Sequence, residues 1–224
     1  MPFTVEEFLQ VFAEYNRAIW PAHIIAYTMG LAAVLAVVGR ARWRGRFVTA
    51  VLALFWLWMG VAYHMVHFSR VNRPAYVFGA FFVLQGILFA IAAARRTLKF
   101  EKPATGAWAT GGLFVLYAMV IYPILGMLAG HGWPQAPMFG VAPCPTTIFT
   151  FGLLLWTGTG IPKRLIVIPF LWSLIGFSAA IHLDVYEDFG LVVAGVVGTT
   201  WIVLRNQSMS QQVTEAERES TAAS

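Results

Sequence analysis

Long stretches without a charged side chain alternate with short polar segments along this chain. Seven stretches lack Asp, Glu, Lys and Arg: 21–39, 47–68, 75–94, 104–130, 146–161, 165–181 and 189–204. A transmembrane helix needs about 20 apolar residues, within a range of about 17–25. The first four stretches are long enough, whereas the last three have only 16 or 17 residues and need polar end residues or local bilayer thinning to complete a crossing. The pattern predicts an all-α integral membrane protein with seven transmembrane helices in one bundle, residues 1–204.

The segments at the two ends of the chain have patterns of their own. Thr4 and Glu7 have the spacing of a capping box, which predicts a helix start. An apolar stripe follows at helical spacing: Phe8, Phe12, Tyr15 and Ile19. We therefore predict an amphipathic helix over 4–18 that lies on the outer face of the membrane. Residues 205–224 are polar and rich in Ser, Thr, Gln and Glu, which predicts a disordered cytoplasmic tail.

The composition supports a membrane location and excludes a soluble domain. Hydrophobic residues make up 59% of the chain and charged residues 11%, with a mean hydropathy of +0.71. Soluble domains average about 45–50% apolar and about 25% charged residues. The single cysteine, Cys144, cannot form a disulfide within the chain. The lipid bilayer is thus the first expected partner.

Lysine and arginine are distributed unequally between the two sides that seven spans imply. Twelve of them fall on one side, in the segments 40–46, 95–103, 162–164 and 205–224. The other side carries only Arg17, Arg70 and Arg73. By the positive-inside rule, the N-terminus is outside and the C-terminus is cytoplasmic. The same loops account for the net charge of +5, so the charge does not call for a nucleic-acid partner.

Polar side chains that could form a site collect toward the outer side of this topology. All five histidines lie there, and His64 and His67 have the spacing of one helix face shared with Gly60. Ionisable groups inside a membrane segment are functional candidates, since burying them without a partner is costly. The candidate residues for binding a solute or an ion are His23, Tyr27, His64, His67, Thr146, Thr147, His182, Asp184, Glu187 and Asp188.

The string Pro143-Cys144-Pro145-Thr146-Thr147 is the most distinctive local sequence. The two prolines prevent a regular helix from entering from the preceding loop, so the fifth span begins near Pro145. The free N–H groups and the two threonine hydroxyls at that helix start would suit an anion. Short helices that aim such ends at a cavity occur in transporters, although a plain helix cap fits the string equally well.

Three kinds of function remain open from these residues. The first is a small-solute or ion permease without a cofactor, in which histidines and acids couple protons or bind the solute. The second is a membrane-embedded metal-binding protein or hydrolase that holds a divalent transition metal on His64, His67 and His182. The third is a non-catalytic sensor or assembly partner, and homo-oligomers are compatible with all three. We favour the permease, and therefore a protein that is not an enzyme.

Two pairs of motifs indicate an internal repeat. Trp20-Pro21 and Trp133-Pro134 precede the first and fifth spans. Trp56-x-x-x-Gly60 and Trp172-x-x-x-Gly176 lie in the second and sixth spans, at a similar offset. This arrangement would fit two parallel three-helix units joined by the fourth span, a 3+1+3 plan.

Two resemblances add to this interpretation. Ser178-x-x-x-His182 resembles one element of the seven-span zinc-dependent membrane hydrolases related to alkaline ceramidases, but their His-x-x-x-His in a late span is absent. Nearly the whole chain except the tail resembles an uncharacterised bacterial family, domain of unknown function sixty sixty-four. The matching strings are Pro2-Phe3-Thr4, Tyr15-Asn16, Ile19-Trp20-Pro21, Tyr63-His64, Asn72, Phe139-Gly140, Pro143 through Thr150, Trp172 and Glu187-Asp188. The resemblance implies a bacterial cytoplasmic (inner) membrane location and a generic permease label, with no known activity.

Overall fold

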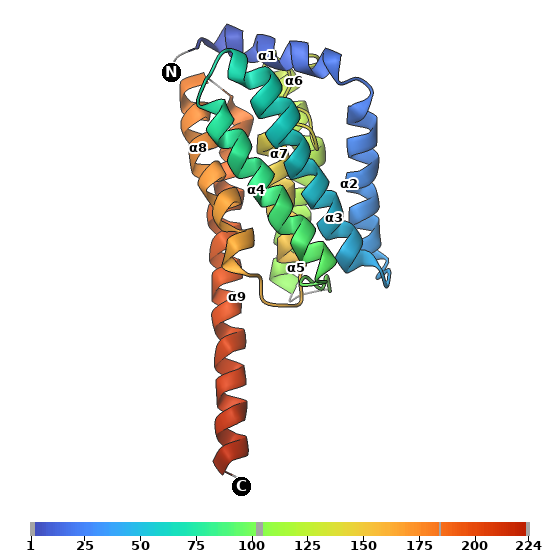
Figure 1. Ribbon diagram of the computed structural model, residues 1–224, viewed down its shortest axis with the longest axis vertical. Helices are drawn as coiled ribbons and strands as arrows, with labels where there is room; N and C mark the ends of the chain where they lie inside the picture. Colours follow the sequence, from blue (N-terminus) through green and yellow to red (C-terminus); the bar gives the residue numbers. More distant parts are fainter. Residues whose placement is uncertain (1–2, 102–104, 184, 223–224) are drawn as a thin grey trace.

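The protein is a bundle of helices with one helix lying across its end and another extending far beyond it (Figure 1). The computed structural model describes residues 3–101, 105–183 and 185–222. The α-helices are α1 (Val5–Ala18), α2 (Ala22–Val38), α3 (Arg44–Trp58), α4 (Ala75–Ala94), α5 (Thr105–Leu116), α6 (Tyr122–Leu128), α7 (Pro143–Leu155), α8 (Val167–Leu183) and α9 (Phe189–Ala222). Short segments join or extend them: the π-helices η1 (Met59–His67) and η3 (Tyr117–Ile121), and the 3₁₀ turns η2 (Phe68–Arg70), η4 (Lys163–Leu165) and η5 (Tyr186–Asp188).

Five helical segments of the described chain are long and apolar enough to cross a membrane. They are Arg44–Arg70, Ala75–Ala94, Gly106–Leu128, Lys163–Leu183 and Tyr186–Thr221. Helices α1 and α2 meet the same criteria only as a pair, and they are bent by 86° at their junction. Helix α7 has 13 residues, about 20 Å at 1.5 Å per residue, and a bilayer core is about 30 Å thick. The structure therefore supports five spans, or six with the bent pair, and does not confirm seven.

The outer surface of the bundle is apolar, as a membrane environment requires. Large hydrophobic side chains are exposed along the helices, with Ile25 and Leu35 of α2 each 59% exposed and Val77 of α4 56% exposed. Others point outward from α5, α8 and α9, among them Leu113, Leu171 and Val193. Exposed apolar surface of this extent is unfavourable in water but costs nothing against lipid chains.

Helix α1 forms a cover over one end of the bundle, which we call the α1 end (Figure 1). The predicted capping box is present, with Glu7 N–H donating to Thr4 Oγ1 at 3.1 Å. The buried Tyr15 hydroxyl donates to the Val141 carbonyl at 2.9 Å and accepts from Trp58 Nε1 at 2.8 Å. Burial raises the pKa of the Tyr15 hydroxyl above its usual value, so this side chain stays neutral and keeps its donor. These bonds tie α1 to α3 and to the segment before α7.

The helix face predicted for His64 and His67 is not preserved, because η1 is a π-helix. A π-helix pairs residues five apart, so side chains three apart do not share one face as they do in an α-helix. The Nδ1 atom of His67 lies 2.7 Å from the carbonyl oxygen of Ala62, five residues earlier, and it donates to that oxygen. His64 is fully buried, whereas His67 is only half-buried beside α1. The structure separates the two rings.

Helix α7 lies inside the bundle, and all but one of its residues are buried. Arg205 of α9 holds the end of this helix. Its Nη1 donates to the Thr157 carbonyl at 2.7 Å, and its Nη2 donates to Thr157 Oγ1 at 2.8 Å. The carbonyls at a helix C-terminus lack partners within the helix and carry partial negative charge, so the guanidinium both satisfies and neutralises this end.

Arg205→Met is expected to destabilise the protein by roughly 2 kcal/mol, because hydrogen bonds to a charged donor are lost from a half-buried site. The matched change Arg218→Met lies on the exposed part of α9 and should have almost no effect. Thermal unfolding of the two detergent-purified variants measures the difference. Equal unfolding temperatures would show that Arg205 does not hold α7 in place.

The segment predicted to be disordered is helical in the structure. Helix α9 continues without a break through Ala222, well past the rest of the bundle (Figure 1). Residues 206–224 contain no Gly or Pro. Because the membrane-spanning part has already nucleated the helix, each further residue adds a hydrogen bond without a new nucleation cost. Polar composition alone therefore did not predict disorder correctly.

Candidate functional site at the α1 end

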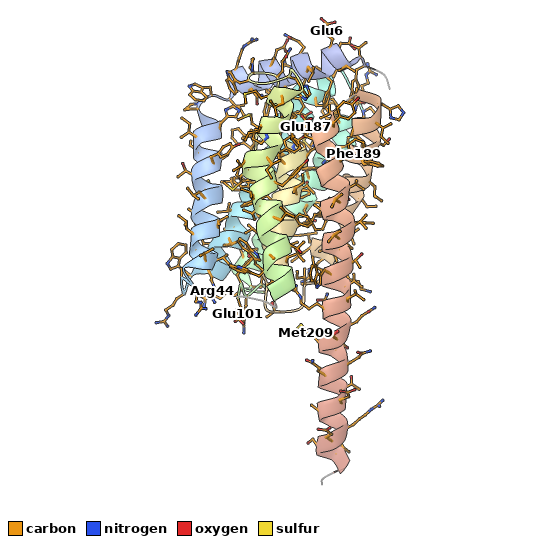
Figure 2. All side chains as sticks on the ribbon, turned by 180° about the vertical axis from the view of Figure 1, so that it is seen from behind. Glu6, Arg44, Glu101, Glu187, Phe189 and Met209 are labelled. Atoms are coloured by element: carbon orange, nitrogen blue, oxygen red, sulfur yellow. The ribbon has the colours of Figure 1, made fainter. Side chains whose placement is uncertain are left out.

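A cavity of about 480 Å³ lies at the α1 end, between α4 and α8 and below α1. We call it the outer cavity, after the side of the membrane that the sequence predicts for this end. Its lining comes from most elements of that end: Phe3, Phe8, Phe12, Tyr63, Phe68, Asn72, Pro74, Phe78, Pro137, Pro143, Cys144, Trp172, Leu174, Ile175, Gly176, Ser178, Leu183 and Asp188. Figure 2 shows Glu187, the neighbour of Asp188, at the same end as Glu6, whereas Arg44 and Glu101 lie at the opposite end.

Seven of the eighteen described lining residues are aromatic, and their rings contact one another. Phe8 contacts Phe68 with ring centroids 6.0 Å apart, and Phe12 stacks on Tyr63 at 4.9 Å. On the opposite wall, Phe78 meets Trp172 edge to face at 5.7 Å. Such ring pairs are favourable contacts, and they stabilise the packing of the cavity wall.

Asp188 is the acidic group of the cavity and is 3% exposed. The Tyr122 hydroxyl donates to Asp188 Oδ1 at 2.5 Å, and the Cys144 thiol also donates to this carboxyl group. Asp188 directly precedes α9, and the positive end of a helix dipole favours an acid at that position. Both partners of Asp188 are neutral donors, so the carboxyl group is held in place without a countercharge.

Glu187 is placed differently from Asp188, although the two are adjacent in sequence. Its Oε1 lies 2.8 Å from Nε2 of His131, and the Tyr117 hydroxyl donates to its backbone carbonyl at 2.8 Å. Oε2 of Glu187 is buried and has no hydrogen-bond partner. Glu187 is not part of the cavity lining. The pair of acids therefore divides into one that faces the cavity and one that pairs with a histidine.

His64 lies behind the cavity wall and not in it. Both of its ring nitrogens are buried without a hydrogen-bond partner. Its ring is surrounded by the aromatic rings of Tyr63, Phe68, Phe78, Phe82 and Trp172. The Trp172 ring centroid is 5.2 Å away, and Trp172 lines the cavity on its other side. His64 thus packs against the Trp172 ring, which lines the cavity, and is not itself in the lining.

Other candidates are used in local contacts. His23 Nε2 donates to Asn16 Oδ1 at 3.0 Å, because the Asn16 amide already donates to two carbonyls. Tyr27 donates to the Met119 carbonyl at 3.2 Å. The exposed His182 donates from Nδ1 to the Ser178 carbonyl at 2.6 Å. Asp184 lies outside the described residues.

The two threonines of the Pro-Cys-Pro string are fully buried and serve the helix start. Thr146 Oγ1 accepts from the Gly140 N–H at 2.9 Å, and Thr147 Oγ1 donates to the Pro143 carbonyl at 2.8 Å. The helix begins at Pro143, two residues earlier than predicted. Neither threonine lines the outer cavity; Cys144, between the prolines, does.

The structure does not bring together His64, His67 and His182, the three histidines predicted as metal ligands. Among the described residues, no group of three or more His, Cys, Asp or Glu side chains is arranged to hold a metal ion. The rings of Trp20 and Trp133, which belong to the predicted repeat, do meet, with centroids 5.8 Å apart. The repeat itself stays a prediction.

Sequence reasoning missed the uncharged aromatic residues of the site. Tyr122, Trp172 and the α1 phenylalanines were not among the candidates, because aromatic residues at helical spacing usually indicate core packing. The signal that could have found Trp172 is the family resemblance, whose matching strings include Trp172, Pro143-Cys144-Pro145 and Glu187-Asp188. Each of these strings contributes a residue to the lining of the cavity, although they lie far apart in sequence.

The fold and the cavity define a class of protein: an all-helical chain with several helices that could span a membrane and a cavity near one end. The chain belongs to a family described as a family of unknown function (DUF6064), which matches residues 5–213. This confirms the family suggested by the sequence strings. No curated protein and no solved structure matches the chain.

Proposed function

We propose that the protein is a small-solute permease of the bacterial cytoplasmic membrane and that the outer cavity is its solute-binding site. The observation that carries this proposal is the position of Asp188, a nearly fully buried acid that faces an aromatic cavity of about 480 Å³ within the bundle. Cavities of about 300–1,000 Å³ with apolar walls and a few polar groups are typical of small-molecule sites. An ionisable residue inside a membrane bundle commonly marks a substrate or proton path.

Helix α7 supports transport over simple binding. It is too short to cross a membrane alone, and Pro143 and Cys144 at its start line the cavity. Irregular backbone at membrane depth is tolerated where protein buries it or where it lines a cavity, and transporters build their central sites from such interrupted helices. Two π-helices also border this region, and π-turns within helices occur frequently at functional sites.

The charge distribution supports an outward-facing α1 end. The segments 40–46 and 95–101, which carry six of the twelve arginines, join helices at the end opposite α1, where Figure 2 places Arg44. The α1 end carries only Arg17, Arg70 and Arg73. Since loops rich in lysine and arginine stay in the cytoplasm, the outer cavity would receive its solute from outside.

Uptake into proteoliposomes tests the proposal. Vesicles containing the purified protein are incubated with a mixture of small metabolites, and the trapped solutes are identified by mass spectrometry against empty vesicles. Ser178→Trp places a bulky ring in the cavity lining and should reduce the protein-dependent uptake by about tenfold or more. Ser208→Trp makes the same change on the exposed part of α9 and is the matched control.

The two variants also define the contradicting results. Uptake that is unchanged by Ser178→Trp would show that solute does not pass through the outer cavity. Vesicles that trap no more solute than empty ones, with protein shown to be folded and inserted, would contradict the permease function itself.

A further inference from the structure

We infer that the outer cavity binds a hydrophobic organic cation, an ammonium group carried on an aromatic or branched alkyl body. The inference deepens the proposed function, since it assigns the class of solute to the same site. It rests on three features of the described residues: the acid in the lining, the aromatic side chains beside it and the exposed apolar side chains of α8 that also line the cavity.

The lining holds an acid, Asp188, whose described hydrogen-bond partners are the neutral Tyr122 and Cys144 side chains. Among the described residues that form the lining, Asp188 is the acid, and none is Lys, Arg or His. The neighbouring acid differs in its partner, because Glu187 Oε1 lies 2.8 Å from Nε2 of His131. An ionised carboxyl group that is shielded from water is stabilised by an opposite charge, and among the described residues no Lys, Arg or His bonds to Asp188. A cationic ligand would supply it.

The aromatic side chains of the cavity wall also favour an ammonium ligand. Aromatic faces carry negative electrostatic potential and attract ammonium groups, most strongly at tryptophan, and the attraction grows when water is excluded. Tyr63, Phe78 and Trp172 all line the cavity that Asp188 also lines. This combination of rings and one carboxyl group is chemically complementary to an alkylated ammonium. An anion would be repelled by the carboxylate, and a small inorganic cation would not contact the rings.

Exposed apolar side chains in the lining favour a ligand with an apolar body. The cavity is lined by residues of α4 and α8, and its lining includes Leu174 and Ile175 of α8, each 42% exposed. Phe3 and Phe8 cover the cavity from the α1 side. A ligand that partitions into the bilayer interface would reach the cavity between the helices, with its ammonium group directed at Asp188.

Isothermal titration on the full chain in lipid nanodiscs tests this inference with three probes of similar shape. Phenyltrimethylammonium is the cation, tert-butylbenzene is its uncharged carbon isostere, and benzenesulfonate is the anion. The cation should bind at least about tenfold more tightly than the isostere, and the anion should not bind measurably. Equal affinity for the cation and the isostere would overturn the inference.

Two adjacent acids provide matched variants. Asp188→Asn should remove most of the preference for the cation, because it deletes the carboxylate that faces the cavity. Glu187→Gln makes the same chemical change in a residue outside the lining and should keep the preference. A preference that survives Asp188→Asn would also overturn the inference. If Asp188→Asn does not yield folded protein, the comparison of cation with isostere on the native chain decides the question alone.

The test separates this inference from the proposed function. It measures binding and needs no transport. A chain that prefers the cation but moves no solute in proteoliposomes would contradict the permease function only. A chain that transports solutes through the cavity but binds the isostere as tightly as the cation would contradict the charge assignment only.

Discussion

Replacing Gly111 with alanine is expected to destabilise the protein by about 1–3 kcal/mol or more, the cost of overpacking a close contact. A Cβ atom on Gly111 would lie 2.6 Å from Trp156 Nε1 and 2.7 Å from the Gly152 carbonyl oxygen. The backbone of α7 cannot yield locally, and Trp156 cannot swing away. Its indole stacks on Trp108 with centroids 4.5 Å apart and donates to the Trp108 carbonyl at 2.9 Å.

The next residue is the control for this prediction. A Cβ atom on Gly112 would meet only Trp156 Cζ2, at an ordinary contact distance of 3.7 Å. Gly112→Ala should be neutral or slightly stabilising, since alanine favours helix over glycine. Thermal unfolding of both variants in detergent, followed by intrinsic fluorescence, measures the difference. Equal melting temperatures for the two variants would show that α5 and α7 do not pack as closely as the structure indicates.

The second large effect is an all-or-none difference in cysteine labelling, which reports the orientation of the chain in the membrane. In a Cys144→Ser background, Gln10→Cys should react with a membrane-impermeant maleimide added to intact cells. Gln211→Cys should react only after the membrane is permeabilised. Both glutamines are exposed, Gln10 on α1 and Gln211 on the extension of α9, at opposite ends of the molecule (Figure 1). The prediction follows from the arginine-rich segments at the end opposite α1.

Because the wild-type chain has one cysteine, this background is otherwise free of thiols and each signal belongs to one position. Labelling of Gln211→Cys in intact cells, with Gln10→Cys protected, would reverse the orientation and place the outer cavity on the cytoplasmic side. The cavity and its preference for a cation would stand, but the solute would be collected from inside the cell.

These predictions depend on different parts of the molecule. The Gly111 contact and the Arg205 bonds both hold the C-terminal part of α7, and the start of α7 places Cys144 in the lining of the outer cavity. Destabilising α7 should therefore weaken ligand binding as well as folding. The orientation experiment is independent of both, because it reads the exposed ends of the chain.

The local features of the chain were predictable from the sequence because they depend on neighbours within a few residues. The capping box of Thr4 and Glu7 formed as predicted, since both partners lie in one helical turn. Apolar runs became helices, since a bilayer leaves the backbone few alternatives. Their lengths were less predictable: the helix in the region of the apolar stretch 146–161 runs from Pro143 to Leu155, and Arg205 binds the Leu155 and Thr157 carbonyls at its end.

The composition of the site was not predictable in the same way. Sequence reasoning named Asp188 and Glu187 together, but only the packing of distant helices assigns one to Tyr122 and the other to His131. It placed His64 and His67 on one face, and the π-helical turn separated them. The sequence by itself determined a family member with apolar helices and an amphipathic cover, because hydropathy and caps act locally. Only the tertiary structure decided which acid faces the aromatic cavity, because that depends on contacts between residues far apart in the chain.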